Sequence, residues 1–206
     1  MNKNICIYGG SFDPITNAHE MVLTKICNLN WIDEIWVVIS KCRNDKELTY
    51  FQHRYEMLSI IINNASEILK NKIFLKDLEY INKITPTYDL LKTQKEKYPN
   101  NTFYFCLGSD LLSDISLWDN SEKLILENYF IIIERGNFKI DKNILKQFPK
   151  YYLIEFKHLS EVNFISSSNI RKMLAKNNNP KELKKLINPL ILDYIKKHNL
   201  YQCNVE

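Results

Sequence analysis

The sequence predicts a protein of the α/β class, in which helices cover both faces of a parallel β-sheet and a helical tail ends the chain. Six apolar runs of strand length recur along the 206 residues, and segments with helical periodicity lie between most of them. Strands that alternate with helices favour a parallel sheet built from right-handed crossovers. The pattern changes after Ser166, where no further strand-like run occurs.

The first half of the chain contains three predicted strands and two predicted helices. The apolar run NICIY predicts a strand at 5–8, and apolar residues at helical spacing in MVLTKICNL predict a helix at about 18–29. The continuous apolar run IWVVI predicts a buried strand at 35–39. A second periodic segment predicts a helix at about 51–63, and a short third strand follows at 73–75.

The alternation continues through the next part of the chain. A helix is predicted at about 87–97 and a strand at 103–107, where the sequence reads FYFCL. Shorter helical patterns follow at 109–114 and 121–127. The run YFIIIE then predicts a fifth strand at 129–134.

The last predicted strand lies at 152–156, and the helical tail occupies about residues 166–206. Three short helices are predicted in this tail, at 169–175, 180–186 and 189–198. The last two open with proline, which suits the first helical turn. The segment NNNP between the first two is interpreted as a helix stop and a turn.

The composition is that of a globular protein. Hydrophobic residues make up 45% of the chain and charged residues 25%, close to globular averages. A chain of 206 residues is long enough to bury one sizeable core, so we expect one domain over residues 1–206. No apolar run approaches the roughly 20 residues needed to span a bilayer, and we therefore expect no membrane partner.

Cysteine usage and net charge indicate in which compartment the protein works and which classes of partner to expect. The five cysteines show no CxxC or Cys/His pairing, which predicts a reducing, cytoplasmic location and no structural zinc. The net charge of +4 is modest, with lysines scattered among acids, so a nucleic-acid partner is not expected. A local anion-binding site is enough to account for a positive charge of this size.

The stretch GGSFDPITNAHE, residues 9–20, joins the first predicted strand to the first helix. Ligands of open parallel sheets bind beyond the carboxyl ends of the strands, and residues 9–16 form such a loop. Gly9 and Gly10 allow backbone to approach a ligand closely or to adopt a positive φ, and Asp13 with Pro14 predicts a stiff turn. The four glycines of the chain exclude the GxGxxG and GxxxxGK[ST] phosphate motifs.

The start of the first helix carries a candidate phosphate ligand. Asn17 suits the N-cap position, and Glu20 three residues later would complete a capping box. This places His19 at about the second helical position, beside unpaired backbone N–H groups and the positive end of the helix dipole. The alternative is an ordinary strand, turn and helix with a surface histidine.

GGSFDPITNAHE resembles the GGTFDPxHxGH signature of the nucleotidyltransferases with an adenylyltransferase-type Rossmann-like fold. The resemblance implies that this junction binds the phosphates of ATP. Thr16 replaces the first histidine of the signature and keeps a hydroxyl donor, and Ala18 replaces the glycine. The residues that the signature assigns to ATP here are Gly9, Gly10, Ser11, Phe12 and His19.

ISSSNIRKML, residues 165–174, resembles the ISST-x-IR motif of the same superfamily. Ser166, Ser167 and Ser168 crowd a helix N-terminus, where hydroxyl and backbone groups can donate hydrogen bonds, and Arg171 can clamp phosphate oxygens. The resemblance implies that these four residues bind ATP. Serines before a helix are also common caps, so capping alone is the alternative.

GSDLLSDISLW, residues 108–118, is similar to the GxDxLxxxxxW segment of the nicotinate/nicotinamide mononucleotide adenylyltransferases. The resemblance implies that Gly108 and Asp110 lie near the bound nucleotides and that Trp118 stacks on the pyridine ring. The alternative for Trp118 is an ordinary core or lid aromatic.

Two weaker similarities complete the predicted site. TPTYDLL, residues 85–91, is similar to the family's SYTxxTL, with Thr85 and Thr87 at its hydroxyl positions. RNDK, residues 43–46, occupies the place of the PPHK loop, and the alternative for Lys46 is a solvated surface lysine. Arginines 54 and 135 also match family arginines, and either could be purely structural. The residues assigned to the mononucleotide are Ser11, Lys46, Thr85, Thr87, Asp110, Trp118 and Arg135.

The resemblance implies the transfer of AMP from ATP to a pyridine mononucleotide, with release of pyrophosphate, in NAD biosynthesis. The catalytic donors would be His19, Thr16, Lys46 and Arg171, which align two anions and neutralise charge. Mg2+ would accompany ATP, with no metal ligand from protein side chains. Nicotinate is favoured over nicotinamide by the short, bacterial-type chain, and both monomers and homodimers occur among relatives.

Two alternatives remain open. Pantetheine-phosphate adenylyltransferase shares the TxGH variant seen around Thr16 but fits the chain length, the 108–118 segment and the 165–171 motif less well. A nucleotide-binding regulator that lost turnover is suggested by the departures at Ala18, Pro86 and the 43–46 loop.

Overall fold

The sheet contains six parallel strands in the order β3-β2-β1-β4-β5-β6, so the predicted α/β class with a Rossmann-like parallel sheet is confirmed. The computed structural model describes residues 2–43, 47–79, 85–134, 140–155, 165–176 and 180–202. The strands are β1 (Asn4–Gly10), β2 (Glu34–Ile39), β3 (Ile73–Lys76), β4 (Thr102–Gly108), β5 (Tyr129–Ile133) and β6 (Tyr151–Ile154).

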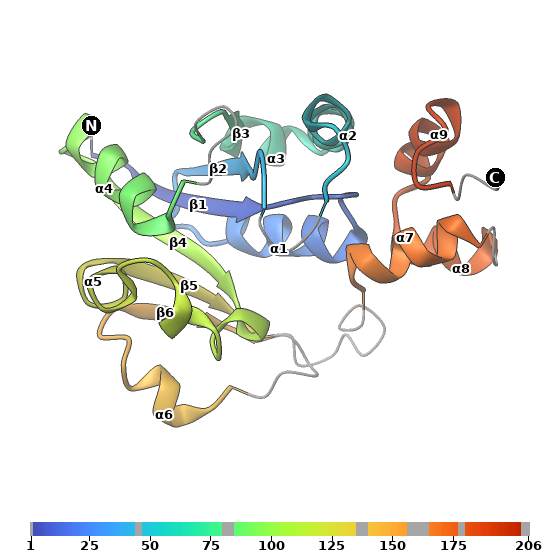
Figure 1. Ribbon diagram of the computed structural model, residues 1–206. Helices are drawn as coiled ribbons and strands as arrows, with labels where there is room; N and C mark the ends of the chain where they lie inside the picture. The colour runs from blue at the N-terminus through green and yellow to red at the C-terminus, as the bar shows by residue number, and fades with distance from the viewer. Residues whose placement is uncertain are drawn as a thin grey trace.

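Helices cover both faces of this sheet, as Figure 1 shows. One core contains side chains of α1, α2, α3 and the tail helices α7 to α9, and a second core contains those of α4, α5 and α6. The helices are α1 (Asn17–Cys27), α2 (Phe51–Asn63), α3 (Glu67–Lys72), α4 (Thr87–Lys97), α5 (Ser121–Glu127), α6 (Lys142–Leu145), α7 (Ser167–Ala175), α8 (Pro180–Leu186) and α9 (Pro189–Lys197).

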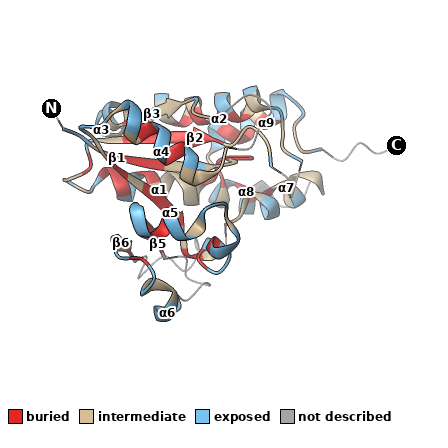
Figure 2. Ribbon diagram, turned by 60° about the vertical axis from the view of Figure 1, so that its left-hand side comes forward, coloured by how far each residue is buried: buried red, intermediate tan, exposed pale blue. Residues whose placement is uncertain are grey.

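The central strands are buried on both faces, which explains why their sequences are apolar without alternation. Successive side chains of a strand point to opposite faces, and Cys6 accordingly belongs to the first core while Ile5 and Ile7 belong to the second. Figure 2 shows the buried residues concentrated in the sheet and on the inner sides of the helices. Burial raises the pKa of the Cys6 thiol well above its usual range.

Several predicted boundaries need correction. Strand β1 extends to Gly10, because Gly9 and Gly10 pair with Val38 and Ile39 of β2. The predicted helix at 109–114 is instead a 3-10 turn, η1 (Ser109–Leu111), followed by a second, η2 (Ile115–Leu117). Serine and aspartate recur in this segment and compete with helical backbone hydrogen bonds, which favours short turns. Helices α3 and α6 were not predicted, because both are shorter than two periods of a helical pattern.

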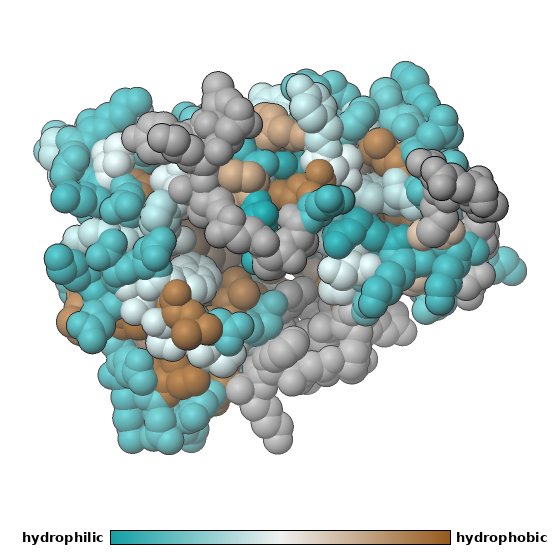
Figure 3. Space-filling model, in the orientation of Figure 1, coloured by the Kyte–Doolittle hydropathy of each residue, from teal (hydrophilic) through white to brown (hydrophobic). Residues whose placement is uncertain are grey.

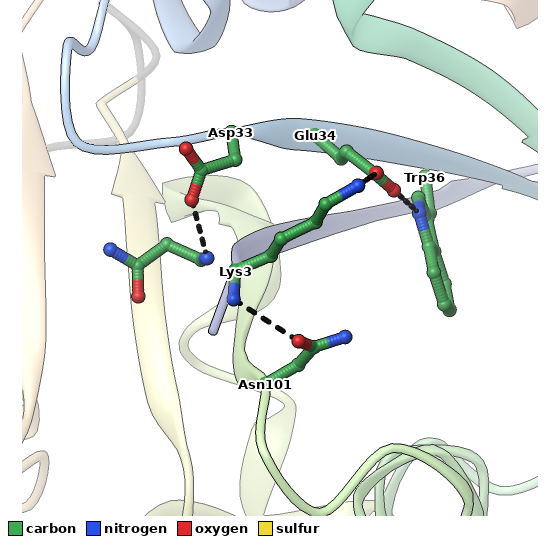
Figure 4. A network of polar contacts seen from close by, with 6 residues as sticks. Lys3, Asp33, Glu34, Trp36 and Asn101 are labelled. Carbon is green, nitrogen blue, oxygen red and sulfur yellow. Dashed lines mark hydrogen bonds and ion pairs between the residues drawn. The ribbon is translucent and has the colours of Figure 1, made fainter. Parts of the chain in front are cut away.

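A polar network fixes the amino-terminal edge of the sheet, at the end opposite to the carboxyl ends of the strands (Figure 4). The backbone N–H of Lys3 donates to Asn101 Oδ1 at 3.1 Å, and its side chain forms an ion pair with Glu34. The Trp36 indole also donates to Glu34, at 2.7 Å. These contacts hold β1 between β2 and β4 at its first residues.

The tail helices lie beside α1 and α2, so chain segments far apart in sequence are neighbours in Figure 1. The side-chain amide of Asn17 donates to the carbonyl of Lys185 at 2.9 Å, and the Tyr194 hydroxyl in α9 hydrogen bonds to Glu56 in α2. No helix among the described residues is long and apolar enough to cross a membrane.

Glu20 lies in the first turn of α1 against the tail, where Asn188 approaches it at 3.4 Å, and burial raises the pKa of its carboxyl. Because the pKa of this carboxyl is higher in the folded state, the protein loses stability as the pH rises from the ordinary pKa of 4.5 through the pKa of the folded state. We therefore expect Glu20→Gln to raise the melting temperature at pH 7, with a gain that disappears below about pH 4.

Glu122 supplies the matched control, because it occupies the first turn of α5 and is exposed. Glu122→Gln loses only the helix-dipole attraction and should be neutral or slightly destabilising at pH 7. Thermal unfolding of both variants between pH 4 and 8 checks this, and a Glu20→Gln gain that persists unchanged at pH 4 would contradict the explanation.

Candidate active site

The order of the strands reverses between β1 and β4, and a pocket of about 770 Å³ opens where these two strands end. Ligands of open α/β sheets bind at such a switch point. Glycine ends both strands, at Gly10 and Gly108, so no side chain fills the space between them. In Figure 3 this face of the molecule is hollowed in the middle, and apolar residues lie beside the hollow.

Most of the predicted site residues come together in the wall of this pocket. They belong to segments that lie far apart in the sequence, from the β1 loop to α7. The predicted residues that line the pocket are Gly9, Gly10, Ser11, Phe12, His19, Thr85, Thr87, Gly108, Asp110, Trp118, Ser167 and Arg171.

Three described residues that were predicted as ligands lie outside the pocket wall. Thr16 is fully buried, and Ser166 caps α7 by accepting the N–H of Asn169 at 3.2 Å. Ser168 is exposed on the first turn of α7. Ser166 thus makes the capping contact, and its role toward ATP stays a prediction. Two further predicted residues, Lys46 and Arg135, lie outside the described residues.

His19 is held by Thr16, which corrects the predicted start of α1. The N-cap is Thr16 rather than Asn17, with extended φ and ψ of −128° and 165°, and His19 rather than Glu20 occupies the third helical position. The Thr16 N–H donates to His19 Nδ1 at 3.0 Å, and the Thr16 hydroxyl lies 2.8 Å from the same atom. Both contacts of Thr16 are thus made to His19, and its role toward phosphate stays a prediction.

This geometry fixes the tautomer of the His19 imidazole. A backbone N–H can only donate, so Nδ1 must accept and is unprotonated. The proton of the neutral ring is then on Nε2, so this nitrogen is a donor. The ring of Phe12 packs edge-on against the imidazole, with ring centroids 5.2 Å apart, and this contact also restricts the orientation of the imidazole. His19 therefore presents an oriented N–H donor in the pocket wall.

The glycines of the loop supply space rather than an unusual backbone conformation. No described glycine has a positive φ, and the positive φ of this loop occurs instead at Phe12, at 47°. A Cβ atom on Gly10 would lie 3.0 Å from Cζ of the Phe12 ring. Gly10 thus lets the Phe12 ring fold back against the end of β1, where it contacts His19.

We expect Gly10→Ala to destabilise the protein by about 1 to 3 kcal/mol, because the buried Phe12 ring must move to admit the methyl group. Gly9→Ala is the matched control, since its Cβ would meet only Phe105, at an ordinary 3.8 Å. Urea unfolding measures both variants. Equal losses of stability for the two would show that contact with Phe12 is not the cause.

The predicted phosphate ligands of α7 contact the β1 loop in this structure. Arg171 Nη1 donates to the carbonyl of Asp13 at 2.7 Å, and the Ser167 hydroxyl donates to the carbonyl of Pro14 at 2.8 Å. The peptide bond between Asp13 and Pro14 is cis. The two motifs at opposite ends of the chain are therefore joined by direct hydrogen bonds, and Arg171 lies in the pocket wall with guanidinium donors beside the loop.

Arg54 in α2 has the structural role that the sequence left open. Its side chain is fully buried and donates to the carbonyls of Thr49 at 2.8 Å, Ser11 at 2.9 Å and Ser40 at 2.6 Å. Burial lowers the pKa of its guanidinium, while the Asp13 carboxylate opposes this shift. Arg54 thus ties the β1 loop, the end of β2 and the start of α2 together beneath the pocket.

The opposite side of the pocket carries the predicted pyridine site. Trp118 follows η2 and packs edge-on against Phe105 of β4, with ring centroids 6.3 Å apart. Thr85 and Thr87 lie at the start of α4, whose N-cap is Pro86. Indole, hydroxyl groups and a helix N-terminus here suit a flat ring with a polar substituent.

The sequence analysis placed the loop at 43–46 in the site but missed Ser40, Cys42 and Glu79 in the pocket wall. Ser40, Cys42 and Arg43 follow β2, and Glu79 follows β3. Glu79 accepts the Lys41 N–H at 2.9 Å, and burial raises the pKa of its carboxyl. The signal that could have found them is their position after the carboxyl ends of two predicted strands.

Two observations bear on ligands and metals. The Ser11 hydroxyl oxygen is buried and has no hydrogen-bond partner among the described residues, which leaves it for a ligand in the pocket. The described part of the chain contains no group of three or more His, Cys, Asp or Glu side chains that could hold a metal ion. Asp13 in particular is committed, because its carboxylate accepts the Thr49 N–H and the Tyr201 hydroxyl.

Comparison with known proteins identifies the family. The family model described as Cytidylyltransferase-like matches residues 7–173, and a probable nicotinate-nucleotide adenylyltransferase of Streptococcus mutans is 30% identical over 97% of this chain and 89% of its own. The chain belongs to the cytidylyltransferase-like family, in its nicotinate-nucleotide adenylyltransferase branch.

Other members of this branch cover the chain equally well. The nicotinate-nucleotide adenylyltransferase of Bacillus subtilis is 27% identical over 97% of this chain and 99% of its own. The solved structure of Plasmodium falciparum nicotinic acid mononucleotide adenylyltransferase complexed with NaAD has 69% identity, a TM-score of 0.95 and full coverage of both chains. A second structure of that name, complexed with APC, has 67% identity and a TM-score of 0.93. Membership of the branch makes the chain a nucleotidyltransferase.

Proposed function

We propose that this protein transfers AMP from ATP to nicotinate mononucleotide, releasing pyrophosphate and forming a dinucleotide for NAD biosynthesis. The observation that carries the proposal is that one pocket joins His19 and Arg171, which suit phosphates, to Trp118, which suits a pyridine ring. The names of the relatives support the same reaction. ATP would lie over the β1 loop and α7, and the mononucleotide would lie against Trp118.

The reaction requires little acid–base chemistry. A 5′-phosphate oxygen of the mononucleotide forms a bond to the α-phosphorus of ATP, and the bond from that phosphorus to the bridging oxygen breaks as pyrophosphate leaves. The attacking oxygen is already an anion, so no general base is needed. The chain must align two anions and offset the charge that develops during transfer. His19 Nε2–H is suited to this charge because its other nitrogen is fixed by Thr16.

Arg171 and Lys46 complete the proposed set of donors. Arg171 would donate to phosphate oxygens, either in place of its hydrogen bond to the Asp13 carbonyl or in addition to it. The hydroxyl groups of Ser11 and Ser167 belong to the same pocket wall. Lys46, which follows the β2 segment in the sequence, stays a proposed donor. Backbone groups at Gly9, Gly10 and Gly108 would allow close approach of the nucleotides.

Mg2+ enters the proposal together with ATP. The donors of the pocket suit phosphate rather than a metal ion, and Asp13 is already occupied by two hydrogen bonds. Bound by the triphosphate, Mg2+ would offset the charge of the leaving pyrophosphate.

The test is pyrophosphate release from ATP and Mg2+ with nicotinate mononucleotide, nicotinamide mononucleotide and phosphopantetheine in parallel. The proposal expects turnover with nicotinate mononucleotide, at a higher kcat/KM than with the amide. Turnover with phosphopantetheine alone would support the pantetheine-phosphate alternative. Binding of ATP without turnover of any acceptor would support the regulator instead.

Three further predictions accompany this function. A single domain over residues 1–206, a cytoplasmic location and assembly as a monomer or homodimer all suit such an enzyme. Light scattering of the purified chain would give the assembly state.

A further inference from the structure

Residues 199–201, which follow α9, form a turn that leads to the β1 loop. After α9, Asn199 adopts a left-handed conformation with φ of 50°. Its N–H donates to the carbonyl of Lys196 at 3.2 Å, and the N–H of Leu200 donates to that of Ile195 at 3.0 Å. This pair of bonds is a Schellman motif, for which asparagine is suited at the left-handed position. Leu200 packs against the first core, so the turn is anchored by an apolar contact.

Tyr201 is the residue that this turn brings to the β1 loop. Its hydroxyl donates to Asp13 Oδ1 at 2.6 Å, and the side chain of Thr49 also hydrogen bonds to it. Tyr201 has a φ of 61°, which is rare for an aromatic residue and costs of the order of 1 kcal/mol or more. Such a conformation persists only where neighbouring contacts fix it, and here the contact with Asp13 does so.

Asp13 is the point where four segments meet. Its side chain is 1% exposed, and its second oxygen accepts the Thr49 N–H at 3.1 Å. Its own carbonyl accepts the Arg171 guanidinium, so the position of Asp13 determines where Arg171 lies. Arg54, which donates to the Ser11 carbonyl two residues earlier, supplies the neighbouring positive charge.

We propose that Tyr201 is a positioning residue for AMP transfer, whose hydroxyl holds the Asp13 carboxylate and thereby fixes the β1 loop and Arg171 relative to the pocket. The inference rests on the proposed function for its kinetic consequence, and on the hydrogen bonds alone for its structural one. It assigns a role in the reaction to the end of the chain, about 190 residues away in sequence from the loop it holds.

The hydroxyl is suited to this task because it remains a donor at every working pH. Burial and the Asp13 carboxylate both raise the pKa of Tyr201 far above its ordinary value of 10.0. Phenylalanine at this position would keep the ring packing and leave Asp13 Oδ1 without its donor in a buried place. A buried carboxylate that loses one hydrogen bond shifts to recover another, and the loop moves with it.

The experiment compares Tyr201→Phe with Tyr194→Phe. Tyr194 belongs to the same tail, and its hydroxyl also donates to a carboxylate, that of Glu56 in α2. Neither tyrosine lines the pocket, but the partner of Tyr201, Asp13, does, whereas Glu56 does not. Both variants therefore lose one tyrosine-to-carboxylate hydrogen bond. We expect Tyr201→Phe to lower kcat about tenfold with KM for ATP changed less than threefold, whereas Tyr194→Phe keeps at least half of the kcat. Equal effects on kcat from the two variants, or an unchanged kcat in Tyr201→Phe, would overturn the inference.

Hydrogen exchange separates this inference from the proposed function. The backbone amides of residues 11–13, 15 and 16 should exchange faster in Tyr201→Phe than in Tyr194→Phe, because only the first variant releases the β1 loop. This comparison needs no turnover, so it remains informative if the wild-type protein transfers AMP to no acceptor. Identical exchange of these amides in both variants would overturn the inference even if the wild-type protein is active.

Discussion

We expect replacement of His19 by alanine to lower kcat by at least two orders of magnitude. The Nε2–H donor of His19 is oriented by two contacts from Thr16 and by the Phe12 ring, and alanine removes this donor. Loss of one oriented donor to developing charge typically costs on the order of 3 kcal/mol in the transition state. Steady-state pyrophosphate release measures the effect.

The expected effect on KM is much smaller than the effect on kcat, because the donor acts mainly as charge develops. His53→Ala is the control, since His53 is half-buried in α2 and its ring contacts Tyr194 away from the pocket wall. A His19→Ala enzyme that keeps the wild-type kcat would remove His19 from the proposed mechanism.

Replacement of Arg54 by methionine should produce the largest loss of stability. The variant fills a similar volume but leaves the carbonyls of Ser11, Ser40 and Thr49 without their buried donor. It also leaves the Asp13 carboxylate without its neighbouring positive charge. Removing one partner of a buried charge network costs about 3 to 5 kcal/mol. Urea unfolding of wild type and variant measures the difference.

Lys92→Met is the matched control, because Lys92 is an exposed cation of α4. Its free energy of unfolding should stay within about 0.5 kcal/mol of wild type. A similar small change in Arg54→Met would mean that water or backbone movement satisfies the three carbonyls, and that Arg54 does not tie the loops together.

The sheet and the location of the site could be predicted because they depend on patterns that the sequence states directly. Short continuous apolar runs such as IWVVI are typical of buried parallel strands. The strand order then brings the ends of β1 and β4 together. Gly9 and Gly10 indicated that a ligand can approach the end of the first strand closely. Trp118 and Arg171 were assigned to the site by the resemblance of their motifs to the family, and both line this pocket.

The detailed roles could not be predicted, because they depend on which atoms meet. Asn17 and Thr16 are both good N-caps, and only the backbone entering α1 decides between them. A buried arginine such as Arg54 has no periodic signature, and its partners are backbone carbonyls that the sequence does not mark. A positive φ is usually adopted by glycine, so the sequence gives no reason to expect it at Phe12. The conformation of Phe12 depends on the packing of its ring against His19.

The central claim is that AMP moves in one step from ATP to nicotinate mononucleotide, and ATP labelled at the α-phosphorus tests it most directly. With Mg2+ and nicotinate mononucleotide present, the account predicts that the label appears in a dinucleotide in step with pyrophosphate release, and that none is retained on the protein. Label bound covalently to the protein, or pyrophosphate release with the label recovered as free AMP, would contradict direct transfer to the mononucleotide.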